Sequence, residues 1–215
     1  MTTPAPPDGP IPTGITAGID ETVVDHGGGV TYVLAAVVFH DAEPARRAFH
    51  QLTADRKRPF HWRREGPTLR EAAVTLLENH PASTYLLAQS TGRRGQVTAR
   101  RELLTYLVAE LTNDGVAHVI IESQDSVLDG RDRHTILDSF QADSTGPPFT
   151  YRWGTKTEPL LWYADALAGV AHAYLAGGRT HHFRHLQKAG IITGVRYMAV
   201  NTQKCVNPGS RPRRP

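Results

Sequence analysis

Three acidic side chains stand directly against apolar stretches of the chain, where carboxylates are unexpected. Asp20 follows Thr-Ala-Gly-Ile, Glu122 follows Val-Ile-Ile, and Asp165 interrupts the run Leu-Leu-Trp-Tyr-Ala-Asp-Ala-Leu-Ala-Gly. An unpaired charge is costly in such surroundings, so each group must be protonated, paired with a cation or bound to a metal. Mg²⁺ and Mn²⁺ prefer carboxylate oxygens, and two such ions about 3.5–4 Å apart can drive phosphodiester cleavage. If the fold brings these residues together, they predict a catalytic divalent-metal site.

Four further acids could add a ligand to this site. Glu21 adjoins the first of the three, but on a strand its side chain points to the opposite face, so it contributes only if the strand ends between them. Asp125, Asp129 and Asp132 follow Glu122 in a polar loop. Any one of these could be a fourth ligand, and capping of the loop and of the next helix is the competing explanation.

The apolar run around Asp165 predicts a helix over residues 158–175, opened by Thr157 as N-cap with Pro159 in its first turn. Ala168, Gly169 and His172 share roughly the helical face of Asp165. Small residues there would let the helix lie close to the sheet and bring its carboxylate toward the strand ends. A packing motif with a capping aspartate is the alternative interpretation.

Basic side chains are clustered rather than evenly spread, although the net charge is only +3. Clustered arginines favour a polyanionic partner such as nucleic acid, and a solvated surface is the plain alternative. In the basic segment after the first predicted helix, Trp62 could stack on a base while arginines contact phosphates, although core packing of Trp62 explains it equally well. The predicted nucleic-acid-binding residues are Arg58, His61, Trp62, Arg63, Arg64 and Lys156.

Eleven histidines include the group His181-His182-x-x-His185. Positions 181 or 182 and 185 share a helix face, so two of these rings could bind a transition metal. Surface histidines on a basic terminal segment are the competing interpretation.

The order of predicted elements indicates the fold class. Strands are expected over residues 15–21, 30–39, 83–89, 117–121 and 149–153, and helices over 43–54, 69–79, 97–113, 133–140 and 158–175. Three glycines at 27–29 connect the first two strands. An ordinary doubly wound sheet would instead alternate strand and helix from the start. The order predicts an α/β, RNase H-like mixed sheet flanked by helices, with a helical insertion after the second strand.

One domain over residues 14–206 is the simplest partition, between a proline-rich disordered leader at 1–13 and a basic disordered tail at 207–215. The leader lacks the apolar core of a secretory signal, and no apolar run approaches the ~20 residues that span a bilayer. The single cysteine, Cys205, precludes an intrachain disulfide and fits a reducing cytoplasm. We therefore expect a cytoplasmic protein without a membrane partner.

Three short motifs resemble a family. Asp20-Glu21, the strand Tyr32-Val-Leu-Ala-Ala-Val-Val38 and the helix Leu161-Trp-Tyr-Ala-Asp-Ala-Leu-Ala-Gly169 are similar to motifs of uncharacterised bacterial RNase H-like proteins that begin with Asp-Glu-Ser-Gly. The resemblance covers about residues 15–178 and implies an RNase H-like fold, an acidic metal site and nuclease activity. Here Thr22-Val23 replaces Ser-Gly, and Glu122 stands where an aspartate is usual.

The leading hypothesis is a metal-dependent nuclease or phosphodiesterase that acts on RNA or DNA with Mg²⁺ or Mn²⁺ held by Asp20, Glu122 and Asp165. The alternative is a non-catalytic nucleic-acid- or partner-binding protein that keeps the fold, which the glutamate at 122 and the altered loop favour. No Ser-His-Asp elbow or phosphate-binding loop indicates a different enzyme class. The sequence neither requires nor excludes a homo-oligomer.

Overall fold

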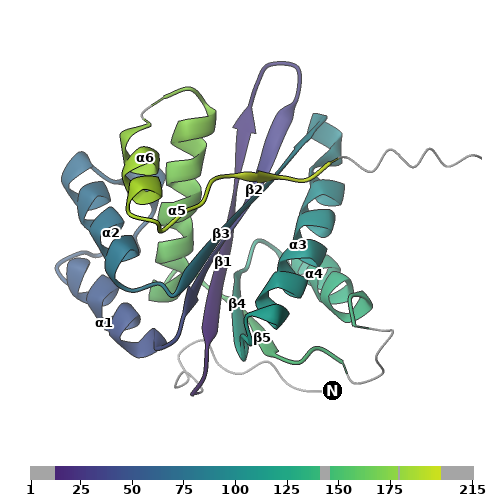
Figure 1. Ribbon diagram of the computed structural model, residues 1–215, viewed down its shortest axis with the longest axis horizontal. Helices are drawn as coiled ribbons and strands as arrows, with labels where there is room; N and C mark the ends of the chain where they lie inside the picture. The colour runs from purple at the N-terminus through teal and green to yellow at the C-terminus, as the bar shows by residue number, and fades with distance from the viewer. Residues whose placement is uncertain (1–12, 141–145, 179, 200–215) are drawn as a thin grey trace, which may run out of the picture.

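A six-stranded mixed sheet, in the order β5-β4-β1-β2-β3-β6, forms the centre of the computed structural model, which describes residues 13–140, 146–178 and 180–199 (Figure 1). The antiparallel pairs are β1–β2 and β2–β3, whereas β1–β4, β4–β5 and β3–β6 are parallel. The strands are β1 (Thr16–Asp25), β2 (Val30–Phe39), β3 (Ser83–Thr91), β4 (His118–Glu122), β5 (Thr150–Gly154) and β6 (Arg196–Tyr197).

The hairpin of β1 and β2 is the longest pairing in the sheet and runs from Thr16↔Phe39 to Asp25↔Val30. All of β2 is buried, as a strand between two neighbours and under helices on both faces must be. The turn closes with a hydrogen bond from the His26 N–H to Gly29 O at 3.0 Å, and Gly27 has a φ of 79°. β1 ends at Asp25, where this turn begins, and is thus four residues longer than predicted from the sequence, which placed its end at Glu21.

Helices cover both faces of the sheet (Figure 1). One face carries four helices, two from the insertion and two from the C-terminal part of the chain, and the other face carries two helices. The first group is α1 (Ala42–Leu52), α2 (Pro67–Asn79), α5 (Pro159–Leu175) and α6 (His181–Lys188), with the 3₁₀ turn η1 (Trp62–Arg64), and the second is α3 (Gln96–Asn113) and α4 (Ser126–Asp138), with η2 (Arg93–Gly95) before α3. The predicted fold class, an RNase H-like mixed sheet with a helical insertion after the second strand, is confirmed.

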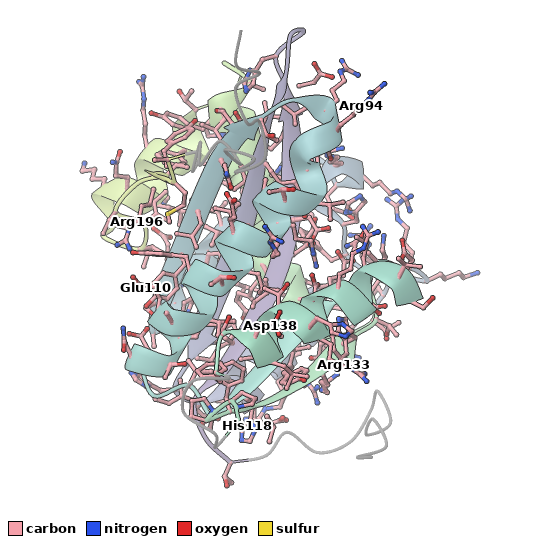
Figure 2. The ribbon with its side chains drawn as sticks, turned by 90° about the vertical axis from the view of Figure 1, so that its right-hand side faces the viewer. Arg94, Glu110, His118, Arg133, Asp138 and Arg196 are labelled. Carbon is pink, nitrogen blue, oxygen red and sulfur yellow. The ribbon has the colours of Figure 1, made fainter. Side chains whose placement is uncertain are left out.

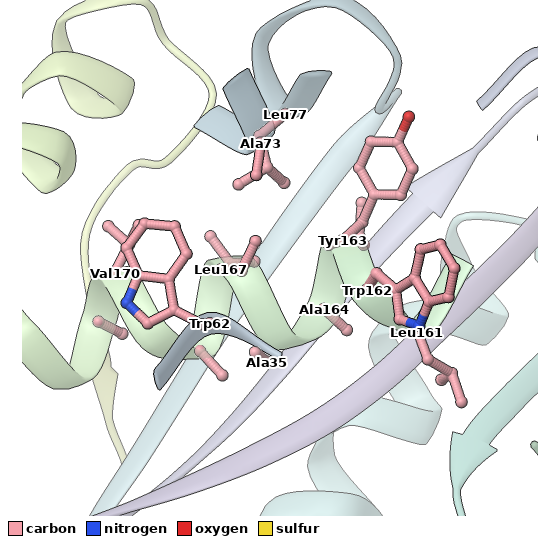
Figure 3. Close-up of a cluster of buried hydrophobic side chains, with 14 of the residues drawn as sticks. Ala35, Trp62, Ala73, Leu77, Leu161, Trp162, Tyr163, Ala164, Leu167 and Val170 are labelled. Carbon is pink, nitrogen blue, oxygen red and sulfur yellow. The ribbon is translucent and has the colours of Figure 1, made fainter. Parts of the chain in front are cut away.

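Two apolar cores fill the spaces between sheet and helices. In the first, Phe49 and Tyr163 meet edge to face with ring centroids 4.7 Å apart, and Trp62, Leu167 and Ala35 belong to the same cluster (Figure 3). The second lies under α3, whose leucines at 103, 104, 107 and 111 are all buried. These cores hold α5 against β1 on one side and α3 against β2 on the other.

Several predicted boundaries were wrong. α4 begins at Ser126 rather than 133, because Asp125 caps it by accepting hydrogen bonds from the N–H groups of Val127 and Leu128. The N-cap of α5 is Glu158 rather than Thr157, since the Glu158 carboxylate accepts from Leu160 N.

Two short elements after α5 were absent from the predicted order of elements, although the spacing of the three histidines at 181, 182 and 185 was interpreted on a helix. They are α6 and the strand β6, whose two residues pair with Leu87 and Ala88 of β3. Arg196 of β6 lies beside Glu110 of α3 at 3.1 Å (Figure 2). This ion pair helps to hold a strand that is too short to carry a sequence signal of its own.

None of the helices in the described part of the chain is long and apolar enough to cross a membrane. Most of the predicted leader, the end of the predicted domain, Cys205 and the whole predicted tail lie outside the described residues.

Candidate acidic metal site

Asp20 and Glu122 come from neighbouring parallel strands at the centre of the sheet. Ile19 of β1 pairs with Ile121 of β4, so the next residue of each strand stands at the same level and faces the same side. Asp20 is 5% exposed, and its carboxyl group is within hydrogen-bonding reach of the Glu122 carboxyl. Two of the predicted ligands therefore share one point of the sheet.

Asp165 reaches the same region because α5 lies unusually close to β1. A Cβ atom on Gly18 would stand 2.8 Å from the backbone oxygen of Leu160, so only glycine fits where the start of α5 crosses the strand. One turn further along the helix, the charge of Asp165 acts on Asp20, and the charge of Glu122 acts on Asp165. The structure thus brings the three predicted acids together on one face.

This proximity perturbs the ionisation of the group. The pKa of Asp20 is raised well above its ordinary value, first by burial, then by the hydrogen bond with Glu122 and the neighbouring negative charges. Burial also raises the pKa of Asp165, although the Trp62 N–H and His61 act in the opposite direction. Among the described residues no Lys, Arg or His forms an ion pair with Asp20.

Asp165 also performs a structural task. Its Oδ2 accepts the backbone N–H of Trp62 at 2.7 Å, and its Oδ1 lies 3.2 Å from Nδ1 of His61. Within the described residues, the three acids do not each place one oxygen within 4.8 Å of the others. The group is therefore more open than a closed single-ion cage.

Gly169 of α5 acts differently from the prediction that it brings the helix to the sheet. A Cβ on Gly169 would meet Cδ1 of Trp62 at 2.1 Å, so this glycine makes room for the indole of the insertion. Figure 3 shows the ring lying over α5 close to Leu167 and Val170. Close approach to the sheet at the start of α5 depends on Gly18 of β1.

Glu21 and Asp132 do not join the acidic site. Because β1 continues past residue 20, Glu21 points to the opposite face, where its carboxylate lies 2.5 Å from Nη1 of Arg100. Arg100 also binds Asp132 at 2.7 Å and donates to the Tyr32 hydroxyl at 2.9 Å. The prediction that Glu21 or Asp132 is a metal ligand is wrong, because both neutralise a buried arginine on the side of the sheet that carries α3 and α4.

Asp125 and Asp129 serve the start of α4. Asp125 caps the helix, and Asp129 accepts hydrogen bonds from the Ser123 hydroxyl at 2.7 Å and from Gln124 N at 3.3 Å. The competing explanation for these loop acids, helix initiation, therefore accounts for their contacts.

Of the predicted nucleic-acid-binding residues, Trp62 is ruled out as a stacking surface. It is 5% exposed and packs under His182 and against α5, so the suggestion that it stacks on a base is wrong. Arg58, Arg63 and Arg64 are exposed on the insertion, and His61 lies at the edge of the acidic group. Lys156 is exposed too, with its Nζ 4.0 Å from Glu122 Oε1.

The sequence analysis did not predict a polar cluster of Thr22, Arg63 and His172 that lies beside the acidic group. Thr22 stands two residues after Asp20 on the same face of β1, and its hydroxyl lies 3.2 Å from Nδ1 of His172 on α5. Arg63 donates to the Thr22 hydroxyl at 3.2 Å and contacts the same imidazole nitrogen at 3.3 Å. The two-residue period of a strand and the seven-residue spacing from Asp165 to His172 were the available signals.

Comparison with known proteins matched no family model and no curated protein. Among solved structures, the chain is similar to a chain of the PCNA:RNase HII complex from Archaeoglobus fulgidus, with 18% sequence identity, a TM-score of 0.44, and 85% of this chain and 81% of that chain covered. Similarity at this level carries no functional argument, so an activity has to be inferred from the residues of the acidic site.

Proposed function

We propose that the protein is a metal-dependent nuclease, with Asp20, Glu122 and Asp165 as ligands of Mg²⁺ or Mn²⁺. One observation carries the proposal: a buried aspartate without a cationic partner among the described residues stands beside two further carboxylates from different elements. A stable fold tolerates such repulsion where a cation offsets it. The donor set consists of hard oxygens, which fits these ions.

Each residue has a role that follows from its place. Asp20 is the most deeply buried of the three acids and lies on the central strand β1, so we assign it as the shared ligand, and Glu122 and Asp165 complete the set from β4 and α5. A divalent ion held there supplies an activated water and neutralises charge at a phosphodiester. Arg63, held over β1 by Thr22 and His172, puts a cation beside the acids where a substrate phosphate can bind.

A non-catalytic nucleic-acid- or partner-binding protein is the second candidate. The contacts of Asp165 with Trp62 N and His61 favour it, because a carboxylate committed to anchoring the insertion has less freedom to bind metal. The resemblance to uncharacterised RNase H-like proteins is compatible with both candidates. RNA and DNA are both proposed as partners, with the exposed arginines of the insertion as the contact region.

Thermal unfolding during a Mn²⁺ titration tests the metal site. We expect the melting temperature of the wild type to rise with Mn²⁺, by mass action, and Glu122→Gln and Asp165→Asn to lose this shift. Asn keeps an oxygen that can accept the Trp62 N–H, so Asp165→Asn preserves the anchor of the insertion. Asp125→Asn is the matched control, because Asn also caps helices and Asp125 lies outside the acidic group.

Cleavage of labelled single strands, duplexes and RNA–DNA hybrids, with and without Mn²⁺, then separates the two candidates. Metal-dependent cleavage that disappears in Glu122→Gln supports the nuclease. Binding without cleavage in the presence of saturating metal supports the binding protein. If Mn²⁺ leaves the melting temperature of the wild type unchanged, the nuclease proposal is wrong.

A further inference from the structure

A second group of potential metal ligands lies on the outer side of the insertion. Glu71 of α2 faces His181 and His182 of α6, and one carboxylate oxygen and two imidazole nitrogens lie within 4.8 Å of one another. It is the one group of three or more His, Cys, Asp or Glu side chains that meets this distance within the described residues. The ion pairs of His181 and His182 with Glu71 do not include any of the three acids around Asp20.

The distances within this group fit a shared ion better than direct hydrogen bonds. Nε2 of His181 lies 3.4 Å from Glu71 Oε1, and Nδ1 of His182 lies 3.7 Å from Glu71 Oε2. An N–H···O hydrogen bond is normally about 2.9–3.0 Å long. Two ligands that each stand about 2.1 Å from a tetrahedral zinc ion are separated by about 3.4 Å. The two His–Glu separations are close to this value, and one ligand atom from each of the three side chains lies within 4.8 Å of the others.

A second His–Glu pair on the same two helices, one turn along α6 and about two turns along α2, gives an internal comparison. His185 of α6 and Glu78 of α2 also face each other, but Nε2 and Oε1 are only 2.7 Å apart. That pair makes a direct contact without space for an ion, and no third ligand atom joins it within the required distance in the described part of the chain. The wider spacing at Glu71 is therefore local to this group of side chains and is not a feature of the whole helix pair.

The surroundings are compatible with a cation. Arg70 lines the same pocket as these side chains, and its guanidinium is engaged by two backbone oxygens, Trp62 O at 2.9 Å and Arg63 O at 3.3 Å. His182 is largely buried, with its ring 5.5 Å from the Trp62 ring at 77°, so its position is fixed by packing. The side chains of Glu71 and His181 are 60% and 57% exposed, which leaves an entry path and room for water as a fourth ligand.

We propose that Glu71, His181 and His182 form a transition-metal site, with Zn²⁺ as the best match, that links α2 to α6 independently of the acidic site. Two imidazoles and one carboxylate are an established zinc ligand set, and imidazole favours Zn²⁺ over Mg²⁺ or Mn²⁺. Because α6 packs on the segment around Trp62, an ion here ties the end of the described chain to the insertion.

Calorimetric titration of the untagged, full-length protein with Zn²⁺ tests this site. We expect one Zn²⁺ per chain, and Glu71→Gln or His181→Gln to weaken binding about tenfold or more. Both side chains are exposed, so these variants should fold. The matched controls are Glu78→Gln and His185→Gln, which alter the other His–Glu pair of the same two helices and should bind Zn²⁺ as the wild type does.

Asp20→Asn distinguishes this site from the acidic one. Zn²⁺ affinity should be unchanged in Asp20→Asn, and Zn²⁺ should raise the melting temperature of the wild type but not of Glu71→Gln. Absence of Zn²⁺ binding overturns the proposal. So does binding that survives in both Glu71→Gln and His181→Gln, or that is lost in Asp20→Asn.

Discussion

Asp20 is the residue whose environment departs most from what stability alone would select. It is buried, it accepts a hydrogen bond from the adjacent Glu21 N–H at 2.7 Å, and three other carboxylates act on it. Buried polar groups that are retained despite their cost commonly mark functional sites. The metal-free protein should therefore be less stable than its packing would allow.

Asp20→Asn should raise the free energy of unfolding of the metal-free protein at neutral pH by about 1–3 kcal/mol, because it removes a buried negative charge and keeps an oxygen for the Glu21 N–H. The same variant should abolish stabilisation by Mn²⁺. Urea unfolding with a chelator, and then with Mn²⁺, measures both effects. A less stable metal-free variant would contradict the repulsion described above.

The pH dependence has a definite sign. Since the pKa of Asp20 in the folded protein is raised above 3.8, the folded state binds the proton more tightly than the unfolded state. The free energy of unfolding of metal-free protein should thus fall as the pH rises above about 4 through the raised pKa, and the loss should persist at higher pH. In Asp20→Asn this fall should be smaller.

Among the elements, α5 connects the insertion to the site. Asp165 and Gly169 lie one turn apart on it, and both contact Trp62. Asp165 accepts its backbone N–H, and Gly169 leaves room for its ring. The Ala-Asp-x-x-Ala-Gly pattern therefore has a packing role and a carboxylate role at once. The two interpretations made from the sequence, a metal-binding carboxylate and a packing motif, therefore do not exclude each other.

Gly169→Ala tests the contact between α5 and Trp62. A Cβ would stand 2.1 Å from Cδ1 of the indole, so Trp62 must shift, and overpacking of this kind costs about 1–3 kcal/mol. Gly130→Ala in α4 is the matched control, because nothing lies within 4 Å of its Cβ, and alanine should stabilise that helix by about 0.5–1 kcal/mol. Denaturant unfolding of both variants measures the difference, and equal tolerance would refute the close packing.

At the scale of the whole molecule, β1 presents opposite chemistry on its two faces. One face carries Asp20 toward α5, without an ion pair among the described residues. The other carries Glu21 to Arg100, which also binds Asp132 and so joins β1 to α3 and α4. The second face is a neutralised structural network, since the buried arginine has two carboxylate partners.

Arg100→Met should lower the free energy of unfolding by about 3–5 kcal/mol, because it leaves two buried carboxylates without their cation. The melting-temperature rise with Mn²⁺ should remain, since the acids on this face do not bind the metal. Arg101→Met, at the neighbouring exposed position of α3, should change stability by less than about 0.5 kcal/mol. If Arg100→Met loses the Mn²⁺ effect, Glu21 or Asp132 must be a metal ligand after all.

The sequence by itself determined the element order, the fold class and the three acids that meet, because each depends on local patterns: apolar runs, glycine turns and charges beside buried segments. Only the tertiary structure decided which neighbouring carboxylates belong with them. The partners of Glu21 and Asp132 come from elements distant in sequence, and the burial of Trp62 depends on a glycine more than one hundred residues away. Such pairings arise from packing, for which the local sequence carries no signal.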